Sequence, residues 1–248
     1  MLQMNKYALC LMGLIGGSDG SFGGGSTIDY VRCYDHYRKY ILRKSGVDVF
    51  IHCWEPKYQQ RLVELYQPKK FVFEKQRKFS KSLKVQNGFS RWYSSKRTLE
   101  LKKQYEQENN FKYDLVMVGR FDTMWLKPVD FSKFDPQYFW ASNYNTYPGY
   151  HDAVRYEKNN HSLKLKHLQD IWFFSNSDLM DYFGTLFDRY QIKNGFHCNC
   201  CPDIREIYPH AAAYRHLHLG GYENRIRYIF YRGNEYELYR WHVLRKNR

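Results

Sequence analysis

The residues best suited to chemistry follow a short apolar run near the middle of the chain. Leu115 to Val118 is unbroken and rich in valine, which is typical of a strand buried on both faces of an α/β sheet. The run ends in Gly119, Arg120 and Asp122, and ligands of open α/β sheets bind beyond the carboxyl ends of strands. Asp122 could hold a divalent cation while Arg120 pairs with phosphate oxygens. An ion pair that merely ends the strand is the structural alternative.

A second set of charges lies just before this run. The pattern predicts a helix from Ser90 to Glu108, with Arg91, Lys96 and Arg97 near its start. Cations at a helix amino terminus oppose the helix dipole, so a bound anion would account for their position. The alternative is that these side chains simply cover a solvated surface.

A glycine-rich stretch follows the first predicted strand, Lys6 to Leu14. Six glycines occur between Gly16 and Gly25. A strand, a glycine loop and a helix in this order form a phosphate-binding layout, although the spacing matches neither the dinucleotide fingerprint nor a Walker loop. We expect Gly13, Gly16 and Gly17 to flank a bound nucleotide, and a loop that orders over the ligand fits equally well.

The elements that would position these residues alternate along the chain. The predicted strands are Lys6–Leu14, Val47–Trp54, Phe71–Phe73, Tyr113–Val118, Tyr138–Ser142, Leu168–Ser175 and Tyr214–His218. Helices between the first strands predict a parallel sheet with right-handed crossovers. Asp178 to Tyr190 carries one apolar stripe and is the clearest helix. In Tyr214–His218, strand alternation would place His216 and His218 on one face.

Composition narrows the class of partner. The chain has 248 residues, a formal charge of +14 and 19% aromatic residues. This balance favours anionic partners such as nucleotide diphosphates, nucleic acid or a membrane surface. We find no zinc-finger or RNA-recognition signature, and no run approaches the length needed to span a bilayer. No convincing signal peptide is present, so we expect a cytoplasmic protein.

The six cysteines predict no disulfide framework. Cys10, Cys33 and Cys53 lie in or beside apolar segments and are interpreted as core residues in a reducing compartment. His197 and the crowded group Cys198, Cys200 and Cys201 suggest zinc, but they lack the second, separated knuckle of structural zinc sites.

Taken together, four segments resemble a known family. They are Val47–Trp54, Ser90–Ser94, Tyr113–Asp122 and Gln169–Ser175. As a set they resemble the small GT-A-type glycosyltransferases found in bacterial surface-polysaccharide clusters and in large DNA viruses and phages. The resemblance covers roughly Lys6 to Tyr190.

The resemblance implies one GT-A-like α/β domain over residues 1–248. Residues 1–125 would be the nucleotide-sugar-binding half, with a central, mostly parallel, Rossmann-type sheet flanked by helices, and residues 126–248 a smaller acceptor-side half. Such enzymes bind a divalent metal, Mn²⁺ or Mg²⁺, through an Asp-x-Asp motif. Here that position reads Arg120-Phe121-Asp122. Asp122 alone could hold the metal with waters and phosphates, or Arg120 and other cations could replace it.

The same resemblance implies the remaining roles. Asp170 stands where these enzymes place the acid that activates the acceptor hydroxyl, and its aromatic neighbours Trp172 and Phe173 would raise its pKa. A buried structural Asp170 is the alternative. His216 or His218 would be the carboxy-terminal metal or phosphate ligand. The implied partners are a nucleotide-sugar donor and a glycan acceptor, with possible peripheral association with a membrane-linked acceptor and no nucleic acid. A non-catalytic protein that binds nucleic acid or glycan through its basic, aromatic surface is the competing hypothesis.

Overall fold

The computed structural model describes residues 6–15, 28–43, 46–81, 83–143, 168–191 and 209–239. The strands within these ranges are β1 (Tyr7–Gly13), β2 (Val47–Cys53), β3 (Lys70–Phe73), β4 (Leu115–Arg120), β5 (Thr123–Trp125), β6 (Phe139–Asn143), β7 (Phe173–Ser175), β8 (Ile226–Tyr231) and β9 (Tyr236–Leu238). The α-helices are α1 (Tyr30–Tyr37), α2 (Gln59–Tyr66), α3 (Leu83–Glu108), α6 (Ser177–Gly184), α7 (Leu186–Gln191) and α8 (Pro209–Leu219). Short π-helical and 3₁₀ segments complete them: η1 (Arg38–Leu42), η2 (Pro56–Tyr58), η3 (Phe131–Lys133) and η5 (Glu223–Arg225).

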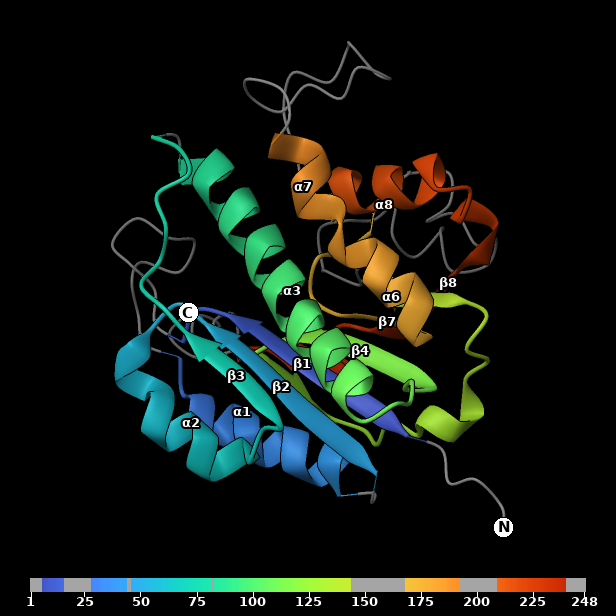
Figure 1. Ribbon diagram of the computed structural model, residues 1–248. Coiled ribbons are helices and arrows are strands. Elements are labelled where there is room, and N and C mark those ends of the chain that lie inside the picture. Colours follow the sequence, from blue (N-terminus) through green and yellow to red (C-terminus); the bar gives the residue numbers. More distant parts are fainter. Residues whose placement is uncertain are drawn as a thin grey trace.

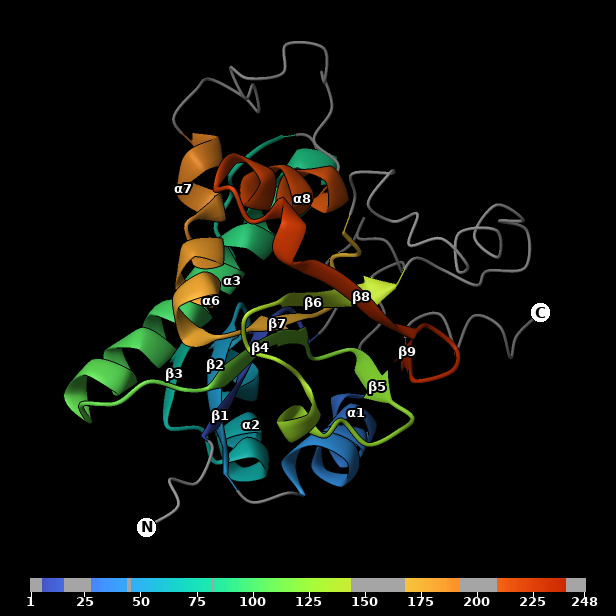
Figure 2. The same ribbon diagram turned by 90° about the vertical axis from the view of Figure 1, so that its right-hand side faces the viewer.

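These elements build an α/β architecture. Among the described residues, seven strands form one twisted sheet in the order β3-β2-β1-β4-β7-β6-β8, and β5 pairs with β9 beside it (Figures 1 and 2). β1, β2, β3 and β4 run parallel to one another, as the strand–helix alternation predicts. β7 runs antiparallel to both β4 and β6, and β8 is parallel to β6. The sheet is therefore mixed but mostly parallel.

Alternation along β1 explains why helices cover both faces of the sheet. Ala8, Cys10 and Met12 pack in one apolar cluster with residues of α3, α6 and α8. Leu9 and Leu11 point to the opposite face, where they pack with residues of α1 and α2. Figure 1 shows these helices on the two sides. A strand that is apolar on both faces has no solvated side, which is why its sequence shows no polar alternation.

A buried ionic network fixes α3 against α6 and β4. Lys102 is fully buried, and its Nζ donates to Glu106 Oε2 (2.9 Å), Asp181 Oδ1 (2.7 Å) and Ser177 Oγ (2.5 Å). Glu106 Oε1 in turn accepts the backbone N–H of Tyr113, which leads into β4. A buried charge is tolerated only when it is paired and hydrogen-bonded. The network therefore sets the position of the helix that carries Arg91.

The structure corrects four of the predicted elements. α3 begins at Leu83, earlier than the predicted Ser90, and the predicted strand from Leu168 to Ser175 is extended only over β7. The helix predicted from Asp178 to Tyr190 is divided into α6 and α7. Tyr214 to His218 is part of helix α8 rather than a strand. Alternation over five residues is too short a signal to distinguish the two periods, and Pro209 with the alanines after it favours a helix start.

Two further predictions concern the buried cysteines and the absence of a membrane-spanning segment. Cys10, Cys33 and Cys53 are buried free thiols, which confirms their interpretation as core residues. The cysteines near residue 200 and the glycines of the loop, Gly16 and Gly17 included, lie outside the described residues. Within the described ranges, no helix combines the length and the apolar character needed to cross a membrane.

Candidate active site

The carboxyl ends of β1 and β4 define the edge where the charged residues gather. The two strands are in parallel register, with Met12 opposite Arg120, so Gly13 follows directly beside the last residue of β4. Gly13 has a φ of +115°, a conformation that side chains other than glycine rarely adopt. Gly13 still pairs with Cys53 of β2, and it carries no side chain that would cover the end of β4.

Antiparallel β7 brings a distant segment to the same edge. In the β4–β7 register Val118 lies opposite Phe173. Residues after Val118 and residues before Phe173 therefore leave the sheet on the same side. Asp170, three residues before β7, is in this way placed near Arg120, two residues after Val118. The strand pairing joins two parts of the chain that the sequence keeps about fifty residues apart.

Arg120 and Asp122 form a two-pronged ion pair. Arg120 Nε donates to Asp122 Oδ1 at 2.8 Å, and Nη2 donates to Oδ2 at 2.5 Å. Burial by itself lowers the pKa of Arg120, but the charge and hydrogen bonds of Asp122 outweigh it and raise the pKa above the ordinary value. The Tyr37 hydroxyl donates to the carbonyl oxygen of Arg120 at 2.8 Å and holds the backbone of this residue.

Arg91 and Asp170 form the second charge pair. Arg91 Nε lies 3.3 Å from Asp170 Oδ2, and the Arg91 side chain is 9% exposed. Burial lowers the pKa of Arg91 to about 10, against the opposing effect of Asp170. The contact of Nε with Asp170 is an ion pair without hydrogen-bond geometry, so neither Nε nor Nη2 of Arg91 has a hydrogen-bond partner among the described residues. A buried guanidinium group with unused donors is costly unless a ligand completes it.

The environment of Asp170 differs from the prediction. Burial raises the pKa of this carboxyl, but Arg91, His210 and Arg120 together bring it below its ordinary value. The predicted raised pKa is therefore wrong, because Trp172 and Phe173 belong to the core around β7 while the carboxylate lies among cations. Asp170 is ionised at neutral pH. It can accept a proton, but its pairing with Arg91 reduces its basicity.

His210 is a site residue that sequence reasoning missed. It lies in the first turn of α8, and its Nδ1 is 2.9 Å from the carbonyl oxygen of Leu168 and 3.2 Å from the amide nitrogen of Asp170. The same Nδ1 lies 3.8 Å from Asp170 Oδ1. Pro209 was the feature of the sequence that could have revealed it. A proline is common in the first turn of a helix, so Pro209 predicts that His210 lies in a helix and not beside a strand.

The residues predicted to bind metal do not converge. His216 is buried, donates through Nε2 to the carbonyl oxygen of Tyr182 and stacks on the Tyr182 ring. His218 is exposed and pairs with Glu223. In a helix, residues two apart point to different faces, so these histidines share neither a face nor a neighbour with Asp122. Among the described residues, no group of three or more His, Cys, Asp or Glu side chains could hold a metal ion.

Two of the predicted phosphate-binding cations lie elsewhere on α3. Lys96 pairs with Asp188 of α7 at 2.6 Å, and Arg97 pairs with Glu100 at 2.6 Å. Because α3 begins at Leu83, neither these residues nor Arg91 lie in its first turn, so the argument from the helix dipole is wrong. Arg91 enters the site because it faces Asp170, not because it is near the helix terminus.

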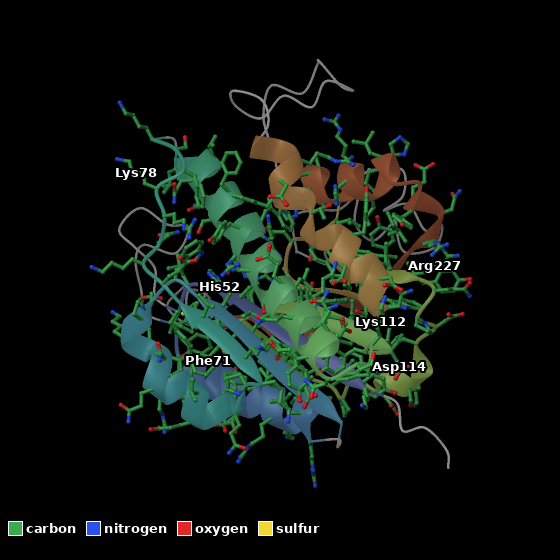
Figure 3. All side chains as sticks on the ribbon, in the orientation of Figure 1. His52, Phe71, Lys78, Lys112, Asp114 and Arg227 are labelled. Carbon is green, nitrogen blue, oxygen red and sulfur yellow. The ribbon has the colours of Figure 1, made fainter. Side chains whose placement is uncertain are left out.

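A separate polar contact joins β2 to α3 near the same edge. His52, labelled in Figure 3, is fully buried; its Nδ1 lies 2.7 Å from Ser94 Oγ and its Nε2 lies 3.0 Å from Glu74 Oε1. Burial lowers the pKa of His52 to about 4, although Glu74 opposes the shift. His52 is therefore neutral at pH 7. It is a packed, hydrogen-bonded core histidine.

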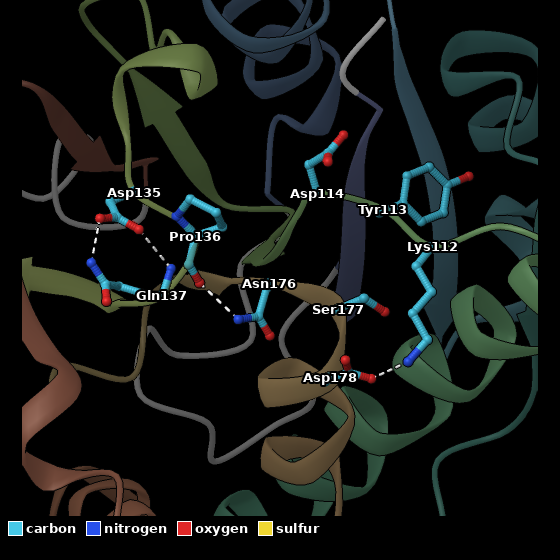
Figure 4. Close-up of a pocket in the computed structure, with 9 residues that line it drawn as sticks. All are labelled: Lys112, Tyr113, Asp114, Asp135, Pro136, Gln137, Asn176, Ser177 and Asp178. Atoms are coloured by element: carbon cyan, nitrogen blue, oxygen red, sulfur yellow. Dashed lines mark hydrogen bonds and ion pairs between the residues drawn. The ribbon is translucent and has the colours of Figure 1, made fainter. Parts of the chain in front are cut away.

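An open cavity of about 600 Å³ lies at the opposite edge of the sheet (Figure 4). Its lining residues precede β4 and β6 or follow β7: Lys112, Tyr113, Asp114, Asp135, Pro136, Gln137, Asn176, Ser177 and Asp178. Its carboxylates are engaged in local contacts, such as those of Asp178 with Lys112 and of Asp135 with Gln137. This cavity has no convergent, unsatisfied polar group, so we assign no chemistry to it.

Comparison with known proteins adds no family assignment. No model of a known protein family matches this sequence, and no curated protein matches it. The basis for a function is therefore the set of charged residues at the carboxyl edge: Arg91, Arg120, Asp122, Asp170 and His210.

Proposed function

We propose that this protein is a glycosyltransferase with a GT-A-like fold. It moves a sugar from a nucleoside-diphosphate donor to a hydroxyl of a glycan or glycoconjugate. The main support is the meeting of Arg91, Arg120, Asp122 and Asp170 at the carboxyl edge of the mostly parallel sheet. In α/β proteins this edge is where nucleotides bind. The net charge of +14 also favours an anionic donor.

Each charge has a role in such a transfer. Asp170 accepts the proton of the acceptor hydroxyl as that oxygen forms a bond to the anomeric carbon. The bond between this carbon and the diphosphate oxygen breaks, and the electron pair leaves with the diphosphate. Arg91 and Arg120 stabilise the negative charge that develops there. A diphosphate that draws Arg91 away from Asp170 would also increase the basicity of the carboxylate. A base in this position favours inversion at the anomeric centre, by analogy with glycosidases.

Thermal-shift screening tests the donor class first. UDP, GDP, CDP and their sugars are added to the full chain, and one diphosphate is expected to raise the melting temperature. Short oligonucleotides are screened in parallel. If oligonucleotides stabilise the protein and no nucleotide does, the glycosyltransferase proposal fails and a nucleic-acid-binding function replaces it.

Substitution of Asp170 tests the catalytic role. Asp170→Asn is expected to lower the transfer rate by about 10²–10⁴-fold, the usual contribution of a general base, while the diphosphate still stabilises the protein. The matched control is Asp178→Asn, which removes a carboxylate that is 74% exposed at the opposite edge of the sheet. Equal rates in Asp170→Asn and Asp178→Asn would exclude Asp170 as the base.

A further inference from the structure

We infer that the cation of this site is supplied by the chain itself: the guanidinium group of Arg120 takes the place of a divalent metal beside Asp122, and diphosphate binding needs no metal ion. That the ligand is a nucleotide rests on the proposed function. That the site can hold a diphosphate at all follows only from the arrangement of Arg120, Asp122 and Arg91.

The first observation is that both oxygens of Asp122 face Arg120. The two contacts, 2.8 Å and 2.5 Å, use the fork geometry that guanidinium and carboxylate groups share. A Mg²⁺ or Mn²⁺ ligand must approach its metal to about 2.1 Å, and a metal on either Asp122 oxygen would lie against a guanidinium group. Repulsion between the two cations disfavours that position.

The second observation is the difference in exposure between the two side chains. The Arg120 side chain is 24% exposed, whereas that of Asp122 is 2% exposed. From solvent, therefore, an incoming group meets the Arg120 side chain before the Asp122 carboxylate. Arginine has N–H donors beyond those that Asp122 uses, and these remain available to phosphate oxygens. The exposed part of the pair binds anions, and the buried part holds the cation in place.

The third observation is that the other candidate metal ligands are engaged. Asp170 lies against Arg91, and His210 Nδ1 lies against Leu168. His216 and His218 contact Tyr182 and Glu223, away from Asp122. The residues that the structure describes around Asp122 therefore do not form the oxygen-rich shell that Mg²⁺ or Mn²⁺ prefers.

Arg91 completes the anion site. Its Nε and Nη2 are buried without a hydrogen-bond partner in the described part of the chain. The charge of Arg91 lowers the pKa of Asp170, and the charge of Arg120 in turn lowers the pKa of Arg91. Two guanidinium groups near one another can hold the two phosphates of a diphosphate. The unused donors of Arg91 are satisfied when the diphosphate is bound.

Calorimetric titration of the full chain separates this inference from the proposed function. The probes are inorganic pyrophosphate and UDP, GDP and CDP, each in EDTA and again in Mn²⁺. We expect pyrophosphate and one nucleotide to bind in EDTA with affinities within about threefold of those in Mn²⁺. Arg120→Gln should weaken binding by at least about tenfold, as expected for loss of a charge-assisted contact worth at least one factor of ten. The affinity of Arg120→Lys, which keeps the charge, should lie between that of the unmodified protein and that of Arg120→Gln.

Two further variants complete the experiment: one is a control for loss of a positive charge, and the other is used if Arg120→Gln does not fold. Arg61→Gln removes a guanidinium that is half-exposed on α2 and paired with Glu64, so affinity should change less than about twofold. If Arg120→Gln does not fold, Arg91→Gln replaces it, because the second guanidinium should contribute a comparable factor in EDTA.

The outcomes are distinct. Binding only in Mn²⁺, abolished by Asp122→Asn, overturns the inference and leaves the glycosyltransferase proposal standing. Binding of pyrophosphate in EDTA without binding of any nucleotide supports the inference and overturns the proposed donor. If neither pyrophosphate nor a nucleotide binds in either condition, both are overturned.

Discussion

Arg91 and Asp170 lie 79 positions apart in the sequence, and yet Arg91 Nε is 3.3 Å from Asp170 Oδ2. Arg91 belongs to α3, and Asp170 lies three residues before β7. The pair is mostly buried, and each charge opposes the effect of burial on the pKa of the other. Of the charges that lower the pKa of Asp170, Arg91 has the largest effect.

The first prediction concerns the pH dependence of transfer. The pKa of Asp170 lies below its ordinary value of 3.8, so the carboxylate is ionised throughout the range from pH 5 to pH 8. The rate kcat/KM should therefore show no acid limb from Asp170 in this range. Arg91→Met removes the main opposing charge and leaves burial, which raises the pKa of Asp170. In Arg91→Met the acid limb that protonation of Asp170 causes should therefore lie at higher pH than in the unmodified protein. Profiles of kcat/KM against pH for the two proteins measure this difference. An unmoved limb would contradict the pairing.

Two buried histidines predict a loss of stability in mild acid. Burial lowers the pKa of His52 and of His216 to about 4, from 6.5. Both are therefore neutral in the folded protein, while the unfolded chain takes up protons below pH 6.5. Their contribution to stability is complete above pH 6.5 and declines as the pH falls towards 4, by up to about 3 kcal/mol for each histidine.

Urea unfolding at pH 7.5 and at pH 4.5 measures this loss. His216→Phe keeps the aromatic stack on Tyr182 and cannot take up a proton, so its free energy of unfolding should fall less between the two pH values. The control is His218→Gln, at an exposed position on the same helix, which should keep the full dependence that His52 and His216 confer. If His216→Phe declines as steeply as the unmodified protein, His216 is not a source of the pH dependence.

The same substitution, lysine to methionine, should cost much more stability at Lys102 than at its neighbour Lys103. Lys102→Met leaves Glu106 buried without its cation and should cost about 3–5 kcal/mol of unfolding free energy. Lys103 is 54% exposed and lies 3.5 Å from Asp181, so Lys103→Met should cost less than about 1 kcal/mol. Chemical denaturation compares the two. Similar values for the two variants would mean that water reaches the network around Lys102.

A side chain at position 119 should disturb the site by a steric clash. An added Cβ at this position would lie 2.8 Å from the Tyr37 hydroxyl, which holds the carbonyl oxygen of Arg120. Gly119→Ala should therefore lower the free energy of unfolding by about 1–3 kcal/mol and weaken pyrophosphate binding. Tyr37→Phe removes the clashing oxygen, so the alanine should cost less in that background. Thermodynamic coupling between the two substitutions is measured by a double-mutant cycle. Strict additivity would show that the steric contact is absent.

The strands β1, β2 and β4 and the placement of Arg120 and Asp122 followed from the sequence. Their apolar runs are continuous and local, and a strand that is apolar on both faces must lie between two layers of helices. The position of Arg120 at the end of such a run places it at the carboxyl edge without further information. The burial of Cys10 follows for the same reason.

Only the tertiary structure decided which other residues reach that edge. Asp170 meets Arg91 because β7 pairs antiparallel with β4, a choice that no local pattern encodes. His210 joins them because α8 begins at Pro209 and packs its first turn against the segment before β7, and the same helix directs His216 and His218 away from each other. The local sequence set which residues lie in buried strands, since that depends on apolar content over a few residues. Strand direction and helix packing set the neighbours of each charge, since these depend on contacts between distant parts of the chain.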